Sequence, residues 1–345
     1  GKAGYVQAGG LVNTLIRIPV QVAAVILGFG VAGLAGGVVA GLLAGACLLL
    51  PFCRFRMRLT SWKTAGEMLR FACWAFLASG GMILYGNIDT ILLGYFASSS
   101  EVGLYRIALQ LASFALFSAL ALQTILYPKF SSWRLDERRE WIAGSLTRAI
   151  SYSLLLALPV CIGGVLLGDS LLFYLYGSPY RSASLALSLL LASQVVYVFV
   201  YLWTMSLSAL GRPRDAAVSA LIACGVNISA NLYLIPLAGL TGAAVAILVT
   251  VLIHAGCAGV LLSREIPLRV DTRALRSIGC ATLIMAGLIW GVIQGVPVES
   301  AGTLALIVVL GAGVYFLVLF RLERHIDTAI RKMMRDMGVV LPPWL

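Results

Sequence analysis

Charged residues are scarce in this sequence. Aspartate, glutamate, lysine and arginine together make up 11% of its 345 residues, whereas a soluble domain carries about 25%. Hydrophobic residues make up 61%, and the mean hydropathy is +0.98. This composition excludes an ordinary water-soluble domain and indicates a chain that lies in lipid.

Residues that hold metals or perform acid–base chemistry are also scarce. The chain has two histidines, and no pair among its seven cysteines has CxxC spacing. Most of these cysteines lie in apolar runs, where they are better interpreted as small core side chains than as disulfides or metal ligands. Glycine-rich phosphate loops and catalytic triads are missing as well. We therefore expect no metal, no cofactor and no enzyme active site.

Long apolar runs are what the sequence does have. A helix needs about 20 apolar residues to cross the hydrocarbon of a bilayer, and lipid offers no partner for open backbone groups. The predicted fold class is therefore an all-α polytopic membrane protein with about ten transmembrane helices. The candidate spans are 9–28, 31–50, 71–95, 103–127, 149–167, 183–210, 215–235, 239–262, 277–294 and 302–320.

The basic residues are unevenly distributed along the chain. With residue 1 on the cytoplasmic side, 22 of the 25 lysines and arginines fall in inner segments, Arg181 falls in an outer segment, and Arg17 and Arg106 fall inside spans. This is the positive-inside pattern, which predicts cytoplasmic ends for a multi-pass protein of the cell membrane. The net charge of +11 thus reports topology beside anionic membrane lipids, and nucleic acid is not an expected partner.

Two basic segments outside the spans, 133–148 and 322–338, carry apolar residues at helical spacing. Each could lie in the membrane interface or could cap the helix bundle as a solvated helix.

One short stretch occurs twice. "AGLAGGVVA" at 32–40 returns as "AGLTGAAVA" at 238–246, with six of nine positions identical. The same offset of 206 maps the first two spans close to the seventh and eighth. Glycine is needed where two helices turn and approach closely, so both copies are expected at hairpin turns.

A duplicated unit is the interpretation that we favour for this repeat. Spans three to eight would form one six-helix lobe, and spans one and two would end a second lobe whose first four helices precede Gly1. The parent would then have fourteen helices, and this chain would be a fragment of it. The expected domains are 1–50, the end of the N-lobe; 71–262, the C-lobe; 277–320, two additional helices; and 321–345, a cytoplasmic amphipathic tail.

Three stretches resemble a known family. "NIDTILLGYFASSSEVGLYRIALQLASF" (87–114) resembles the seventh-to-eighth helix hairpin of polysaccharide flippases, and "LYPKFS" (126–131) resembles the end of their eighth helix. Residues 209–246 resemble their Gly-(Lys/Arg)-Pro, Asn-x-x-x-Asn, Leu-Ile-Pro and Gly-x-x-Gly-Ala-Ala series. The family is the Wzx-type branch of the multidrug/oligosaccharidyl-lipid/polysaccharide exporter superfamily. The resemblance implies a two-lobed flippase fold and export of a polyprenyl-phosphate-linked glycan from the inner to the outer leaflet.

Polar side chains within the spans are candidates for a hydrated substrate cavity, because polar groups in a bilayer usually face protein or water. Asn13, Arg17 and Gln21 share one face of the first span. The other candidates are Arg106 and Gln110 in the fourth span, and Gln194, Tyr197 and Tyr201 in the sixth. Hydrogen-bonded packing between helices is the alternative, and it is the interpretation we favour for Asn227 and Asn231.

Asp89 and Arg106 lie near the outer ends of consecutive spans, joined by a seven-residue loop. They could form a structural ion pair, or Asp89 could take up a coupling ion, either a proton or sodium.

Three functions are compatible with these features. A flippase moves an anionic head group through the bilayer and needs fixed positive charge and hydrogen-bonding groups in its cavity. A multidrug antiporter of the same superfamily would need intramembrane carboxylates, of which Asp89 qualifies here. A membrane glycosyltransferase or ligase would need carboxylates on a sizeable aqueous loop, yet the longest outer loop, 168–182, contributes Asp169 alone. The flippase is the function that the sequence favours.

Overall fold

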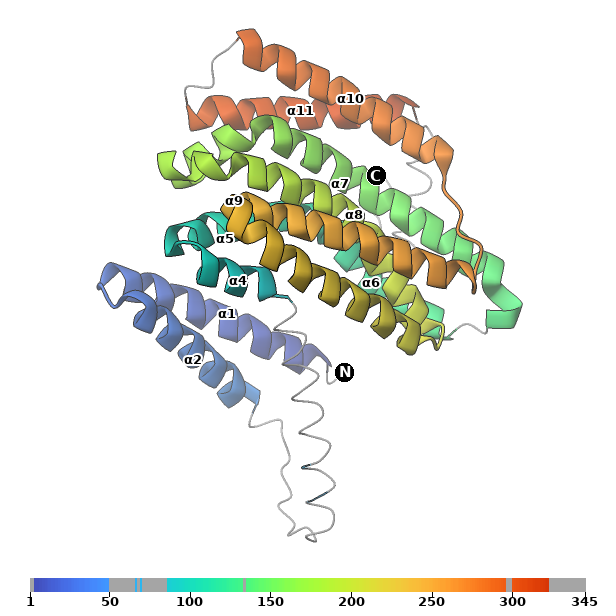
Figure 1. Cartoon of the computed structure of the whole chain (residues 1–345), viewed down its shortest axis with the longest axis horizontal. Helices are drawn as coiled ribbons and strands as arrows, with labels where there is room; N and C mark the ends of the chain where they lie inside the picture. The colour runs from blue at the N-terminus through green and yellow to red at the C-terminus, as the bar shows by residue number, and fades with distance from the viewer. Residues whose placement is uncertain are drawn as a thin grey trace. The chain divides into compact units, whose positions relative to one another are not determined.

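The structure is a computed structural model that describes residues 3–49, 66, 69, 86–132, 135–295 and 300–322. Every regular element within those residues is helical (Figure 1), as the composition predicts. The chain divides into two compact units, Gly1–Leu77 and Ala78–Leu345.

The first unit contains a helical hairpin of α1 (Ala3–Ile26) and α2 (Gly30–Leu49). Gly28 and Gly30 make the turn with φ of +79° and +52°, a backbone conformation that side chains disfavour. Three glycines of α2, at 33, 37 and 41, face α1, and a Cβ on Gly33 would lie 2.6 Å from the Cβ of Ala24. This four-residue glycine spacing lets the two backbones approach closely.

The second unit is a bundle built around one central helix. Its elements are α4 (Ile88–Phe96), α5 (Ser99–Ser113), η2 (Phe114–Leu116), α6 (Phe117–Ser132), α7 (Leu135–Tyr176), η3 (Ser178–Ala183), α8 (Ser184–Ala209), α9 (Pro213–Ser263), α10 (Thr272–Gly295) and α11 (Ala301–Leu322). Helix α8 packs against α5, α6, α7 and α9, whereas α10 and α11 pack on α7 (Figure 1).

Buried clusters explain the central place of α8. Leu187 and Leu190 in its first half belong to a core shared with α4, α5 and α9. Leu202 and Leu207 in its second half belong to a core shared with α6 and the first half of α7. A third cluster joins α7 to α10 and α11. An apolar helix buried on most sides suits the middle of a bundle.

Helix α9 is a hairpin rather than one rod. Ala238 and Gly239 have non-helical backbone angles, with φ of +52° at Gly239, and two arms lie on either side of them. The arms pack so tightly that a Cβ on Gly242 would collide with the carbonyl of Leu234. The Nδ2 of Asn227 in the first arm donates to the Oγ1 of Thr250 in the second at 3.4 Å. The seventh and eighth predicted spans are therefore confirmed.

The two copies of the repeated stretch do not play the same structural role. In α9 the second copy supplies the turn itself, at Ala238–Gly239. In the first unit the turn lies at Gly28–Gly30, so the first copy lies inside α2. The expectation that both copies mark turns is wrong for the first, where small residues serve helix packing instead. The offset of 206 is therefore about one helical turn out of register with the hairpins.

The predicted spans agree with the helices, with some differences. Among the described residues seven helical stretches are long and apolar enough to cross a membrane, with α9 counted once. Helix α1 contributes a shorter apolar stretch, Gly10–Ile26. Of the third predicted span, α4 is the described part, because residues 71–85 lie outside the described residues. The tail beyond Leu322 lies outside them as well. The fourth span is interrupted by the 3₁₀ turn η2.

The amphipathic segment 133–148 is not a separate helix over its described part. Residues from Leu135 onward are continuous with α7, and Ile142 and Leu146 are buried in a core cluster. Part of the apolar face of this segment meets protein, whereas Trp141 is 69% exposed, so the interfacial and the capping interpretations both stay predictions. A helical period shows that a face is apolar but not whether lipid or protein covers it.

Candidate functional site

Helix α5 presents two different chemistries on neighbouring faces. Arg106, Gln110 and Ser113 form an exposed polar stripe along it. Leu111 on α5 and Phe114, the first residue of η2, each lie one residue further along, point about 100° away and line an apolar groove. The Nη1 of Arg106 donates to the Oδ1 of Asn87 at 3.1 Å, so the guanidinium is held at the start of α4.

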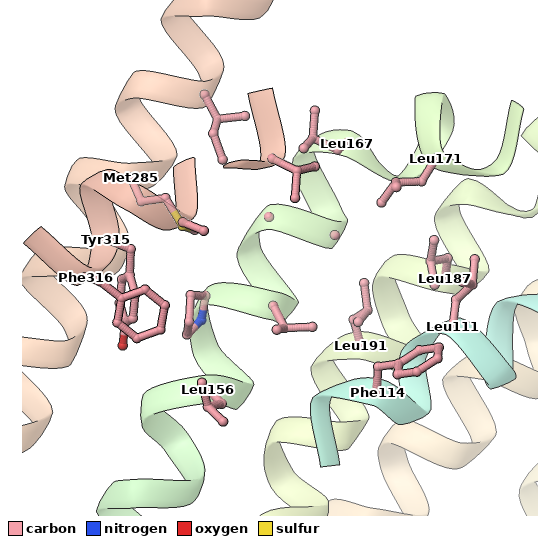
Figure 2. A pocket seen from close by; sticks show the side chains of 17 residues that line it. Leu111, Phe114, Leu156, Leu167, Leu171, Leu187, Leu191, Met285, Tyr315 and Phe316 are labelled. Carbon is pink, nitrogen blue, oxygen red and sulfur yellow. The ribbon is translucent and has the colours of Figure 1, made fainter. Parts of the chain in front are cut away.

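The apolar groove has a volume of about 490 Å³. Figure 2 shows Leu111, Phe114, Leu187 and Leu191 on one side and Met285, Tyr315 and Phe316 on the other, with side chains of α7 between them. The Tyr315 hydroxyl donates to the Leu155 carbonyl at 2.6 Å, so the one polar group of that ring is already occupied. The lining that remains is hydrocarbon, which suits an aliphatic chain.

Of the two alternatives for Asp89, the ion pair with Arg106 is not formed. Asp89 is 4% exposed and accepts a hydrogen bond from the Tyr105 hydroxyl. Tyr105 is completely buried, whereas Arg106, the next residue on the helix, is exposed. The physical reason is that adjacent helical residues point about 100° apart, and a buried guanidinium would lose its hydration.

Glu101 makes a contact that sequence analysis missed. Its backbone N–H donates to Ser98 Oγ at 3.3 Å, which caps α5. Its carboxylate Oε2 accepts from the backbone N–H of Leu240 at 3.1 Å. That N–H belongs to the first turn of the second arm of α9, where negative charge is favourable. The Ser-x-x-Glu spacing is a capping-box signal, but nothing in it reveals a partner 139 residues away.

The polar candidates of α8 are packed inside the bundle. Gln194 is 5% exposed, and Tyr197 and Tyr201 are half-buried with ring centroids 5.9 Å apart. Unlike the side chains of the exposed stripe on α5, these are wholly or partly covered by the bundle.

The candidates of the first unit lie against the glycines of α2. Gln21 donates to the Leu34 carbonyl at 3.1 Å, which is an interhelical contact. A Cβ on Gly41 would lie 2.6 Å from Asn13 Oδ1 and 2.8 Å from the Cβ of Arg17. Asn13 Oδ1 and Arg17 Nε are buried and lack a hydrogen-bond partner among the described residues.

The asparagine pair of α9 serves packing. Asn231 donates to the Asn227 carbonyl at 2.9 Å, and Asn227 reaches Thr250 across the hairpin. The preferred interpretation of Asn227 as a bond between helices is confirmed. Within the described part of the chain no cluster of histidine, cysteine and carboxylate side chains could hold a metal ion.

The fold defines a class before any relative is considered: a multi-pass helical membrane protein whose larger unit combines an apolar groove with an exposed polar stripe. A solved structure has the same fold. The lipid II flippase MurJ in its inward closed conformation matches with a TM-score of 0.76 and 14% identity, over 92% of this chain and 67% of that one.

Sequence comparison gives the family. Residues 6–185, just over half of the chain, match the family described as polysaccharide biosynthesis protein. The chain belongs to this family, as the resemblance to Wzx-type exporters predicts.

Curated relatives include two archaeal proteins from Haloferax volcanii. The probable low-salt glycan biosynthesis flippase Agl15 is 25% identical over 275 residues, and the probable flippase AglR is 28% identical over 281. The matches cover 80% and 79% of this chain but 58% of each relative, so the chain spans little more than half their length.

Proposed function

We propose that the full-length protein is a flippase that carries a lipid-linked oligosaccharide or polysaccharide precursor across the cytoplasmic membrane, for assembly of cell-surface glycans or glycoproteins. The observation that carries the proposal is the double character of α5. One face supplies Leu111 and Phe114 to an apolar groove, and the next exposes Arg106 and Gln110. A substrate with an isoprenoid tail and an anionic sugar head needs both surfaces side by side.

Family membership supports the same function, because the names of Agl15 and AglR describe flippases and the name of the first includes glycan biosynthesis. No covalent step is required, so the protein acts as a transporter rather than as an enzyme. Its partners would be the polyprenyl-phosphate-linked glycan and the surrounding membrane lipids, with the basic loops in the cytoplasm.

Flipping of a fluorescent lipid-linked oligosaccharide in proteoliposomes tests the proposal. Arg106→Ala removes a cation from the stripe and should slow flipping about 10- to 100-fold, as expected from loss of a charge-assisted hydrogen bond. Arg273→Ala is the matched control, since Arg273 is an exposed arginine on α10, outside the stripe. Normal flipping by Arg106→Ala would remove α5 from the substrate path, and no flipping by the unmodified protein would contradict the function.

Gly163→Leu tests the groove. A Cβ on Gly163 would make an ordinary contact with Met285 Cε, at 3.9 Å, so the larger side chain fills the groove without a clash at its base. Flipping of a long polyprenyl carrier should fall, whereas a carrier of a few isoprene units should be affected less. Gly287→Leu on α10, where the Cβ meets open space, is the control and should behave as the unmodified protein does.

Arg17 is the candidate for head-group contact in the first unit. Its Nε is buried without a partner among the described residues, and guanidinium binds phosphate through two parallel hydrogen bonds. Arg17→Ala should abolish export, and Arg17→Lys should retain part of it. If the side chain merely snorkels to the inner lipid head groups, Arg17→Gln would change little. Export at matched membrane levels separates these outcomes.

Asp89 is the candidate for ion coupling, because it is the buried carboxylate among the described residues and its described partner is the neutral Tyr105. Asp89→Asn removes the charge but keeps an oxygen that can accept from Tyr105. Transport driven by a proton or sodium gradient should be lost while expression stays normal. A fully driven Asp89→Asn variant would exclude the coupling role.

A cation-coupled multidrug antiporter is the second candidate, and buried Asp89 is the observation that favours it. Drug efflux that depends on Asp89, without flipping of the lipid-linked glycan, would favour this alternative. A membrane glycosyltransferase or ligase would instead reveal itself by turnover of a sugar donor.

A further inference from the structure

A second apolar groove lies on a different side of the larger unit, between α8 and the second arm of α9. Its volume is about 470 Å³. One wall is made by the rings of Phe199 and Trp203, whose centroids are 5.3 Å apart. The other is made by small residues of α9, with Gly256 open to its surroundings and Gly259 against the Trp203 ring. We call this groove the α8–α9 furrow.

The furrow ends at Ser263 and Leu268, where α9 gives way to the linker to α10. Arg264, the next residue after Ser263, is exposed at the carboxyl end of α9. No ion pair of Arg264 is found among the described residues, whereas neighbouring Arg269 pairs with Glu140 at 2.9 Å. An exposed arginine without an ion pair among the described residues therefore follows directly on Ser263, a lining residue of the furrow, on the side that the positive-inside pattern assigns to the cytoplasm.

Trp203 forms the furrow wall with one edge of its ring, and its unused donor faces away from the furrow. The Cζ3, Cε3 and Cη2 edge of its ring faces Gly259, which leaves Nε1 on the opposite edge. That Nε1 is buried and has no acceptor in the described part of the chain. On that side of the furrow wall lies a cavity of about 270 Å³, which Trp203 lines together with Thr147 and Arg269. Indole N–H groups at a membrane boundary usually find a polar partner.

The linker that closes this end is fixed in place. Arg212 binds Glu265 at 3.0 Å, and Thr147 Oγ1 donates to the Arg269 carbonyl at 3.1 Å. The furrow and its basic end are thus held by contacts on both sides of Leu268, so a ligand would meet a preformed site.

We propose that the α8–α9 furrow binds one anionic glycerophospholipid of the cytoplasmic leaflet, with an acyl chain along Gly256 and Gly259 and the phosphate at Arg264. The apolar walls fit hydrocarbon, and the exposed arginine complements a phosphate. The furrow is a separate site from the groove in Figure 2, because the two share no lining residue.

Native mass spectrometry of the purified, delipidated full-length protein tests the site, with palmitoyl-oleoyl phosphatidylglycerol and phosphatidylcholine as probes. One phosphatidylglycerol should bind about fivefold more tightly than phosphatidylcholine, the ratio expected for one basic residue at a membrane surface. Gly256→Leu should lose both lipids, and Arg264→Gln should bind them equally. Gly287→Leu and Arg273→Gln are the matched controls and should keep the preference.

Equal binding of the two lipids by the unmodified protein would overturn the proposal, as would equal losses in the control variants. Displacement of phosphatidylglycerol by an equal concentration of polyprenyl phosphate would also overturn it and would assign the furrow to the carrier lipid. If Gly256→Leu does not fold, a preference that falls with rising salt and is absent from Arg264→Gln decides the matter.

Discussion

At the scale of the residue, single polar side chains in this protein bond across long stretches of sequence. Glu101 caps the second arm of α9 through Leu240, and a Cβ on Gly239 would collide with the Glu101 carboxylate. Tyr105 holds Asp89 in the same part of the bundle. The Glu101 contact stabilises a turn that would otherwise leave the Leu240 N–H without an acceptor.

Glu101→Ala should therefore lower stability by about 1 kcal/mol, the usual cost of losing a helix cap. Glu101→Gln keeps an acceptor oxygen and should cost less. The measurement is thermal unfolding in one detergent at fixed lipid content. Glu140→Ala is the control, because its pair with Arg269 is exposed and such pairs contribute little. Equal effects of the alanine changes at 101 and 140 would contradict the capping role.

At the scale of the element, the glycines of α2 decide how closely the first hairpin packs. Gly37 lies against Gln21, since a Cβ there would come within 2.5 Å of the Gln21 Cγ, and Gly41 lies against Asn13 and Arg17. Gly36, one residue from Gly37, faces open space. The stripe of glycines is thus specific to the face that meets α1.

Gly41→Ala should destabilise the hairpin by about 1–3 kcal/mol, because an added methyl overpacks a tight contact. Gly36→Ala is the matched control and should be neutral or slightly stabilising, since alanine favours helices over glycine. Resistance of purified variants to heat and to proteolysis measures the difference. Equal changes of stability in the two variants would contradict the packing role of Gly41.

The sequence predicts the elements of this fold better than their contacts. Apolar runs of about 20 residues locate the spans, because a helix needs such a run to cross the bilayer. The 3₁₀ turn at Phe114–Leu116 escapes prediction, because no proline or glycine marks it. That the residues from Leu135 onward are continuous with α7 escapes for another reason: the apolar period is the same in a separate helix and in a continuous one.

For the candidate site, spacing along a helix identifies shared faces but not their surroundings. Gln110 and Gln194 look alike in sequence, yet the first is exposed and the second is buried in the bundle. The sequence offers Arg106 as a partner for Asp89 but does not reveal Tyr105, because a one-residue step along α5 separates the buried face from the exposed one. The groove in Figure 2 escaped prediction, since its lining comes from helices far apart in the chain.

At the scale of the whole molecule, the basic loops imply one orientation in the membrane. Arg181 is the lone basic residue of the expected outer segments, and it is paired with Asp169, whose Oδ2 lies 2.5 Å from its Nη2. The inner segments carry the charge that anionic head groups attract. A protein with this asymmetry should insert in a single direction.

Cysteine labelling checks the orientation. In a cysteine-free background, Ser182→Cys should react with a membrane-impermeant maleimide in intact cells, because Ser182 is exposed beside Arg181. Arg214→Cys, which is exposed at the start of α9, should react after the membrane is opened. The reverse pattern would invert the topology, and labelling of both in intact cells would indicate mixed insertion.

The Glu101–Leu240 bond also has a consequence for the order of folding. The two residues are separated by 139 positions, so α5 leaves the ribosome long before the second arm of α9 exists. During that interval the bundle beside the Glu101 carboxylate is incomplete. The bond forms after the α9 hairpin has entered the membrane. We therefore expect this contact to form late, so that its removal speeds unfolding more than it slows folding.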